Sequence, residues 1–215
     1  MVAREISRQV VLLSDSIFDN GVYLPGEPSV IEQLRSQLPS SADVTLLAID
    51  GSIASDVARQ LERLPSDATD LVVSVGGNDA LGASALFQGS YVDPLLLLRE
   101  LAEAQSAFAM DYREMLTAVR VKGKRTIVCT IYDSIPDMPR WQLSALAYFN
   151  DVILREAIRG GLPVIDLRLV CNDRHDYSAI SPIEPSARGG AKIAAAITQV
   201  LEQHDFSRSV TAVYA

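Results

Sequence analysis

The sequence predicts an α/β fold in which helices cover both faces of a parallel sheet. Two observations support this prediction. Short apolar runs rich in β-branched residues recur along the chain, which is typical of strands buried on both faces. Segments with helical spacing of apolar residues separate these runs, so strand and helix alternate five times. Such an alternation favours parallel strands joined by right-handed crossovers.

Five short segments are expected to be strands, at residues 10–13, 44–49, 71–75, 126–131 and 164–165. Each is mostly apolar throughout, rather than alternating between apolar and polar residues, so each fits a strand that is covered on both faces. The expected architecture has three layers, α/β/α, around a five-stranded parallel sheet. We expect the flavodoxin-like strand order 2-1-3-4-5.

Five helices are expected between and after these strands, at residues 29–38, 53–64, 94–119, 141–158 and 185–201. The first follows Pro28, a favourable residue for a first helical turn. The second has apolar residues at helical spacing and stops before Pro65. The third is the longest, and its apolar positions keep helical spacing over its whole length. The fourth ends at the glycine pair 160–161, and the fifth completes the fold.

The composition indicates a folded protein, because 48% of its 215 residues are hydrophobic and 21% are charged. No repeat or linker-like segment interrupts the chain, so we expect one domain over residues 1–215, with a C-terminal tail from about residue 205. Lys and Arg number 19 against 27 Asp and Glu, a net charge of −8. That acidity argues against nucleic acid and against an anionic membrane surface as partners.

Several absences narrow the expected compartment and chemistry. Residues 1–8 lack the apolar stretch of a signal peptide, and no apolar run approaches the roughly 18 residues of a membrane span. Two cysteines, Cys129 and Cys171, are too few for a disulfide-stapled secreted scaffold. No Cys/His cluster has metal-ligand spacing, and no nucleotide-binding fingerprint is present. We therefore expect a cytoplasmic protein without a metal or cofactor; its oligomeric state is not predicted.

Loops after the first three expected strands carry the candidate functional residues. Ligands of open α/β sheets bind outside the carboxyl ends of the strands. Ser16 follows the first strand and can present its hydroxyl there, or it can serve as a cap or turn residue. Gly51 follows the second and allows close backbone approach, or it is an ordinary turn glycine. Asn78 follows a glycine pair after the third and can donate to a developing oxyanion, or it forms an Asx-turn.

Taken together, these loops resemble the SGNH/GDSL hydrolase family. Residues 14–17 read Ser-Asp-Ser-Ile where the family has Gly-Asp-Ser-Leu, Gly51 matches the glycine of the second block, and residues 76–79 match its Gly-x-Asn-Asp block in full. The resemblance implies an esterase or lipase-like serine hydrolase. Ser16 would attack an ester or acetyl carbonyl to form an acyl-enzyme, and the backbone N–H groups of Ser16 and Gly51 with the Asn78 side chain would form the oxyanion hole.

The last block of the family departs from its pattern in this chain. The family has Asp-x-x-His before the final helix, whereas this sequence has Ser181 and Glu184 at those two positions. The chain contains only two histidines, and His204, near the end of the last expected helix, is expected to interact with the helix dipole. The usual base is therefore absent from its place.

Three alternatives for the base remain open. His175 lies nine residues before Glu184 and is flanked by Asp173 and Asp176, which could orient its imidazole. Glu184 can itself act as the base if burial raises its pKa considerably. In the third alternative the protein is a non-catalytic ligand-binding protein that has lost the histidine base. Residues 81–91 and 168–183 are expected to cover the pocket.

Overall fold

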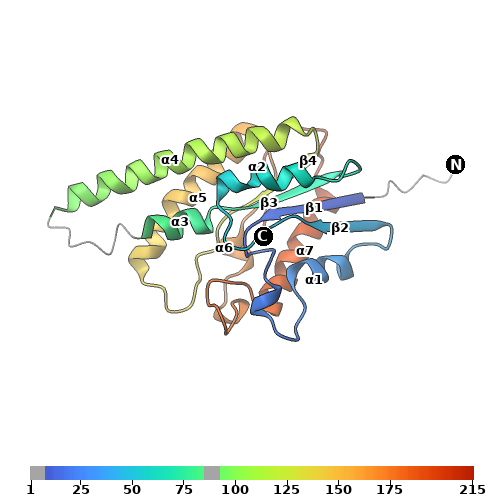
Figure 1. Ribbon diagram of the computed structural model, residues 1–215, viewed down its shortest axis with the longest axis horizontal. Helices are drawn as coiled ribbons and strands as arrows, with labels where there is room; N and C mark the ends of the chain where they lie inside the picture. Colours follow the sequence, from blue (N-terminus) through green and yellow to red (C-terminus); the bar gives the residue numbers. More distant parts are fainter. Residues whose placement is uncertain (1–7, 85–92) are drawn as a thin grey trace.

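The computed structural model describes residues 8–84 and 93–215, and these form a parallel sheet between two layers of helices (Figure 1). The predicted α/β/α architecture is confirmed. The strand order is β2-β1-β3-β4-β5-β6, which contains the predicted order 2-1-3-4-5 and adds a sixth strand at the edge. The strands are β1 (Arg8–Ser14), β2 (Ala42–Leu46), β3 (Asp70–Ser74), β4 (Arg125–Cys129), β5 (Val164–Ile165) and β6 (Val213–Tyr214).

The helices lie in the connections between these strands. The α-helices are α1 (Val30–Gln37), α2 (Val57–Gln60), α3 (Gly77–Ala83), α4 (Pro94–Val121), α5 (Arg140–Gly160), α6 (Leu167–Val170) and α7 (Ala187–Gln203). Single 3-10 turns are η1 (Gly21–Tyr23), η2 (Ala54–Asp56), η3 (Leu61–Arg63) and η5 (Arg174–Asp176). No helix in the described part of the chain is long and apolar enough to span a membrane.

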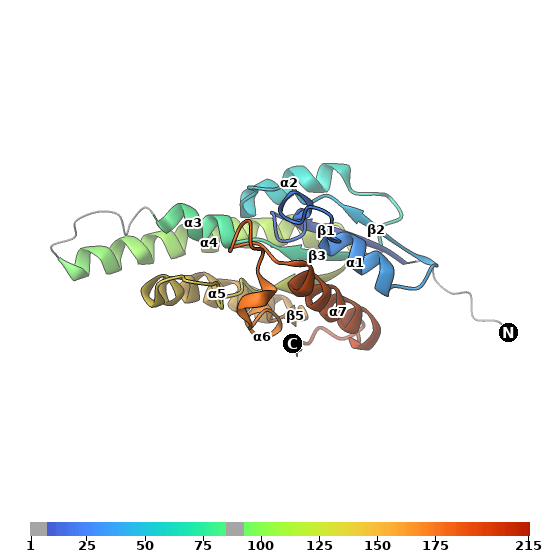
Figure 2. The same ribbon diagram turned by 90° about the horizontal axis from the view of Figure 1, so that it is seen from below.

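Two apolar cores fill the space on either side of the sheet, and β1 contributes alternate residues to each. Val10 and Leu12 face the core that contains buried residues of α1 and α7, whereas Val11 and Leu13 face the core with those of α2, α4 and α5. Figures 1 and 2 show these two helical layers on opposite faces of the sheet. The all-apolar run of β1 therefore follows from its burial on both faces, as the sequence predicted.

The structure contains two short helices that were not expected, α3 and α6, and β4 ends at Cys129 rather than residue 131. Three further differences concern the second expected helix, the second strand and the C-terminal tail. The predicted helix 53–64 is divided into η2, α2 and η3. Strand β2 ends at Leu46 rather than residue 49, because the N–H groups of Leu47 and Ala48 both donate to the carbonyl of Leu12 and so break the ladder register. The expected C-terminal tail contains β6, which pairs in parallel with β5 at the sheet edge.

Candidate active site

Ser16 lies in the tight turn that directly follows β1, at the carboxyl edge of the sheet. The turn is closed by backbone bonds from Phe18 and Asp19 to the carbonyl of Asp15, and the Asp15 side chain accepts the N–H of Ile17 at 3.0 Å. Only 6% of Ser16 is exposed. Its hydroxyl is therefore held at a fixed place beside the strand ends rather than on a free surface loop.

Glu184 meets Ser16 at this edge. It lies just before α7, and its Oε1 accepts a hydrogen bond from the Ser16 Oγ at 2.9 Å. The side chain is buried, and its second oxygen, Oε2, has no hydrogen-bond partner among the described residues. Burial is the main reason that the pKa of Glu184 rises from 4.5 to about 7, with the nearby Asp15 and Asp50 charges adding to it and the Ser16 bond opposing it.

Two more carboxyl groups near Ser16, those of Asp15 and Asp79, have raised pKa values. Burial raises the pKa of Asp15 from 3.8 to about 7, and the charge of Asp79 adds to the rise. Burial likewise raises the pKa of Asp79 to about 6. The site thus contains three buried or half-buried carboxyl groups with raised pKa values, an arrangement often found where a protein catalyses proton transfer.

Asn78 is brought beside the same edge by the start of α3. Gly76 caps this helix with φ of 124°, a backbone conformation that favours glycine, and a Cβ there would come within 3.0 Å of the Phe108 ring. The Asn78 Nδ2 donates to the carbonyl of Ser52 at 3.0 Å, and Asp79 accepts the N–H of Ala54 at 3.1 Å. The turn at the glycine pair therefore places the third loop in contact with the second.

Gly51 lies in the second loop, next to the residue that Asn78 contacts. Its φ is 81°, again in the region that favours glycine, and it is exposed. It is not among the residues that line the cavity at Ser16, whereas Asn78 and Glu184 are. The structure thus brings Ser16, Asn78 and Glu184 together around one cavity and leaves Gly51 at its margin.

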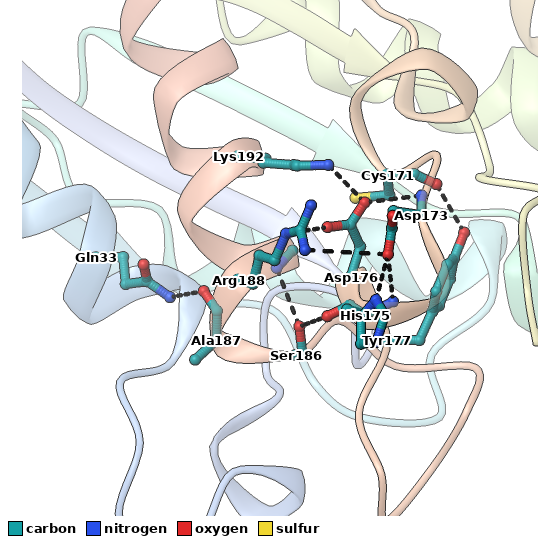
Figure 3. Close-up of polar contacts among 11 residues, drawn as sticks. Gln33, Cys171, Asp173, His175, Asp176, Tyr177, Ser186, Ala187, Arg188 and Lys192 are labelled. Carbon is teal, nitrogen blue, oxygen red and sulfur yellow. Dashed lines mark hydrogen bonds and ion pairs between the residues drawn. The ribbon is translucent and has the colours of Figure 1, made fainter.

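His175 lies in η5, within the loop that precedes α7, and it is exposed. Its Nδ1 pairs with Asp173 Oδ1 at 2.7 Å, and its side chain is 71% exposed (Figure 3). The hydroxyl of Ser186 also donates to the His175 carbonyl at 2.7 Å. His175 is not among the cavity residues, and the Ser16 hydroxyl donates instead to Glu184.

The loop that carries His175 is tied to α7 through the fully buried Asp176. Lys192 reaches its Oδ2 at 2.6 Å and Arg188 its Oδ1 at 3.3 Å, as Figure 3 shows. A Cβ on Gly189 would come within 2.1 Å of the Asp176 carbonyl, so the loop and helix are in close contact. This packing fixes η5 in place with the His175 side chain directed at Asp173.

A cavity of about 130 Å³ opens beside Ser16 and runs between α3, α5 and the loop after β4. Its polar end is formed by Ser16, Asn78, Asp15 and Glu184, and no Lys or Arg is among the described residues that line it. The apolar part of its wall comprises Ile17, Ala80, Leu81, Ala83, Leu101, Ile131, Ile135, Met138, Ala145, Leu146, Phe149 and Ile183. Residues 81, 83, 84 and 183 from the expected covering segments line it, and residues 85–91 lie outside the described chain.

Three residues that hold the site together were not identified from the sequence as site residues. Gln60 is buried in α2, where its amide pairs with both the N–H and the carbonyl of Ser14. Asn20 joins the first loop to the Glu184 segment by donating to the Pro185 carbonyl. Tyr132 lines the cavity and donates to the Ile183 carbonyl. Of the three, only Gln60 could have been found from the sequence, because it is a polar residue at a buried position of an expected helix.

The described residues contain no group of three or more His, Cys, Asp or Glu side chains that could hold a metal ion. Cys129 and Cys171 are both buried as free thiols, and burial raises the pKa of each well above its ordinary value. The polar groups that the structure places at the site are the Ser16 hydroxyl, the Asn78 amide and the carboxyl groups of Asp15 and Glu184.

Comparison with known proteins identifies the family of this chain. The model of the GDSL-like Lipase/Acylhydrolase family matches residues 15–192, which include Ser16, Asn78 and Glu184. The chain belongs to this family. A search of curated proteins found no match.

Solved structures with the same fold include several enzymes of lipid and ester hydrolysis. A lipase from a goat rumen metagenome is 19% identical with a TM-score of 0.66, and the match covers 87% of this chain and 94% of that one. The acetyl xylan esterase AlAXEase is 18% identical with a TM-score of 0.67, covering 90% and 99%. Phospholipase A1 from Streptomyces albidoflavus is 17% identical with a TM-score of 0.65, covering 86% and 95%. At these identities the likeness shows a shared fold.

Proposed function

We propose that this protein is a serine hydrolase that cleaves small esters with a Ser16–Glu184 pair in place of the usual serine and histidine. The single observation that carries the proposal is the 2.9 Å hydrogen bond from the Ser16 hydroxyl to a buried Glu184 oxygen. A carboxylate with an ordinary pKa is a weak base toward a serine hydroxyl. Burial raises the pKa of Glu184 to about 7, and this makes it a better base at neutral pH.

The proposed reaction proceeds in two halves. Ser16 Oγ attacks the ester carbonyl carbon while its proton passes to the Glu184 carboxylate, and the carbonyl oxygen becomes an oxyanion. The carbon–oxygen bond to the alcohol then breaks, and Glu184 returns the proton to the departing alcohol oxygen. In the second half water attacks the acyl-enzyme and gives its proton to Glu184. Collapse of this intermediate releases the carboxylic acid, and Glu184 returns the proton to Ser16 Oγ.

Asn78 is the side-chain donor that we assign to the oxyanion. Its Nδ2 carries two hydrogens, and one is engaged with the Ser52 carbonyl, which fixes the amide while the other N–H remains to donate. The Ser16 and Gly51 N–H groups are proposed to complete the hole, although Gly51 lies at the margin of the cavity. Loss of one such donor costs about 3 to 4 kcal/mol of transition-state stabilisation.

The apolar cavity supports an uncharged acyl group as the part of the substrate that enters the site. The described residues of its wall include no cationic side chain that would pair with a phosphate or carboxylate. Its volume of about 130 Å³ is close to that of protein cavities that accept benzene, so an acyl chain of up to about six carbons would fill it.

Hydrolysis of p-nitrophenyl butyrate by the wild type and three variants tests the proposal. We expect activity in the wild type, its loss in Ser16→Ala and a loss of at least about 100-fold in Glu184→Gln. His175→Ala is the matched control, and we expect it to keep the wild-type rate because His175 is outside the cavity. If the wild type cleaves no short ester but binds one in the cavity, the protein is a ligand-binding member of the family instead.

A further inference from the structure

Among the described residues, only Ser16 forms a side-chain hydrogen bond to the Glu184 carboxylate. Its Oε1 accepts the Ser16 hydrogen bond, while its buried Oε2 has no hydrogen-bond partner among the described residues. In a histidine-based site a carboxylate holds the base in the correct orientation. Here Ser181 occupies the position of the family's aspartate, and its backbone carbonyl contacts Glu184 by accepting the Glu184 N–H at 3.0 Å. The orientation of Glu184 must therefore come from its backbone.

The backbone around Glu184 is held at three consecutive carbonyl groups. The Tyr132 hydroxyl donates to the Ile183 carbonyl at 2.5 Å, and the Ser178 N–H donates to the Glu184 carbonyl at 2.8 Å. The Asn20 amide donates to the Pro185 carbonyl at 3.2 Å. Pro185 further restricts the backbone of the residue before it, which is Glu184. These donors come from three separate parts of the chain, so they fix the segment relative to the sheet.

Tyr132 makes the shortest of these contacts and is itself rigidly placed. It follows β4, its ring is 2% exposed, and it packs edge-on against the Tyr177 ring with 5.1 Å between centroids. It also lines the cavity beside Glu184. Burial raises the pKa of Tyr132 well above its ordinary value, so its hydroxyl remains a neutral donor across the working pH range.

We infer that Tyr132 is a positioning residue for the Glu184 base: its hydroxyl anchors the Ile183 carbonyl and thereby holds the adjacent Glu184 carboxyl against the Ser16 hydroxyl. This inference rests on the proposed function. The tyrosine acts through the backbone and takes the orienting task that the aspartate has in an Asp-x-x-His block. Without the anchor, the Ile183–Glu184 segment can shift, and displacement of a catalytic group by about 1 Å can cost about 100-fold in rate.

The test compares Tyr132→Phe with Tyr177→Phe. Both changes remove one hydroxyl from the same aromatic pair, but the Tyr177 hydroxyl donates to the Cys171 carbonyl, away from Glu184. With p-nitrophenyl butyrate, we expect kcat of Tyr132→Phe to fall about tenfold or more while KM stays within about twofold, because the cavity wall keeps its ring. Tyr177→Phe should keep the wild-type kcat, whatever its effect on thermal stability.

A second variant covers the case in which Tyr132→Phe does not fold. Asn20→Asp replaces the donor to the Pro185 carbonyl but keeps an oxygen for the Val30 N–H, and it should also lower kcat more than it raises KM. Equal kcat in the wild type and in every folded anchor variant would overturn the inference, as would an equal loss in Tyr177→Phe. Those results leave the proposed function standing if Glu184→Gln is inactive, whereas a wild type without esterase activity overturns both.

Discussion

Glu184→Gln should make the protein more stable at pH 8, because the substitution removes a buried charge that forms no ion pair with any described residue. Burial raises the pKa of Glu184 from 4.5 to about 7, so the folded state resists its ionisation and the unfolded state does not. The contribution of protonated Glu184 to the free energy of unfolding is therefore complete below pH 4.5 and is lost as the pH rises through 7. The difference of about 2.5 pH units corresponds to about 3 kcal/mol.

Glutamine is a close match for the protonated form of Glu184. Either side chain offers an oxygen to the Ser16 hydroxyl and leaves a buried donor at the place of Oε2, which has no partner. The free energy of unfolding should therefore differ by less than about 1 kcal/mol at pH 5 and by about 3 kcal/mol at pH 8, in favour of the glutamine variant. The difference at pH 8 corresponds to a rise in Tm of about 6 to 12 °C for a chain of this size.

Urea unfolding of both proteins at pH 5 and pH 8 measures these differences. Glu202→Gln serves as the control, since Glu202 is exposed on α7, and it should change the stability by less than about 0.5 kcal/mol at either pH. An equal difference between wild type and Glu184→Gln at the two pH values would refute the reasoning. A glutamine variant that is less stable at pH 8 would refute it as well.

Three further predictions concern activity and packing. Since Glu184 must be ionised to accept the Ser16 proton, kcat/KM for a short ester should rise with pH through about 7, and a rate that is independent of pH between 5 and 9 would contradict this. In a series of p-nitrophenyl esters, kcat/KM should rise about fourfold for each added methylene from acetate to hexanoate and then level off, because each buried methylene contributes about 0.8 kcal/mol. Ala145→Leu narrows the cavity and should abolish this gain for the longer chains. Gly189→Ala should lower the free energy of unfolding by about 1 to 3 kcal/mol in urea titrations, because its Cβ would clash with the Asp176 carbonyl. An unchanged free energy of unfolding would contradict the close packing of this loop against α7.

The sequence was sufficient for the fold because four of the five expected strands are mostly buried on both faces, the exception being the second, which lies at the sheet edge. Val10 to Leu13, for example, contribute alternately to the two cores and leave no polar face. The edge strand β6 could not be predicted, since two paired residues leave no periodic signal. The division of the expected helix 53–64 was missed because its apolar spacing is the same for an α-helix and for short turns that bury one face.

The site was partly predictable for a related reason. Ser16 and Asn78 follow strands whose ends meet at one edge, so topology alone brings them together. The positions of His175 and Glu184 relative to Ser16 depend on how the loop before α7 folds, and that is fixed by contacts distant in sequence, such as Lys192 with the buried Asp176. The anchoring hydroxyl of Tyr132 depends on a pairing across 51 positions, which no local pattern reveals.

The most direct test of the Ser16–Glu184 pair is mass spectrometry of the protein after reaction with a fluorophosphonate, which phosphonylates an activated serine with loss of fluoride. The proposal predicts a single adduct on Ser16 in the wild type and in His175→Ala. It predicts no adduct in Ser16→Ala and labelling at least about 100-fold slower in Glu184→Gln. A wild type that takes no label, or a Glu184→Gln variant that is labelled at the wild-type rate, would contradict it.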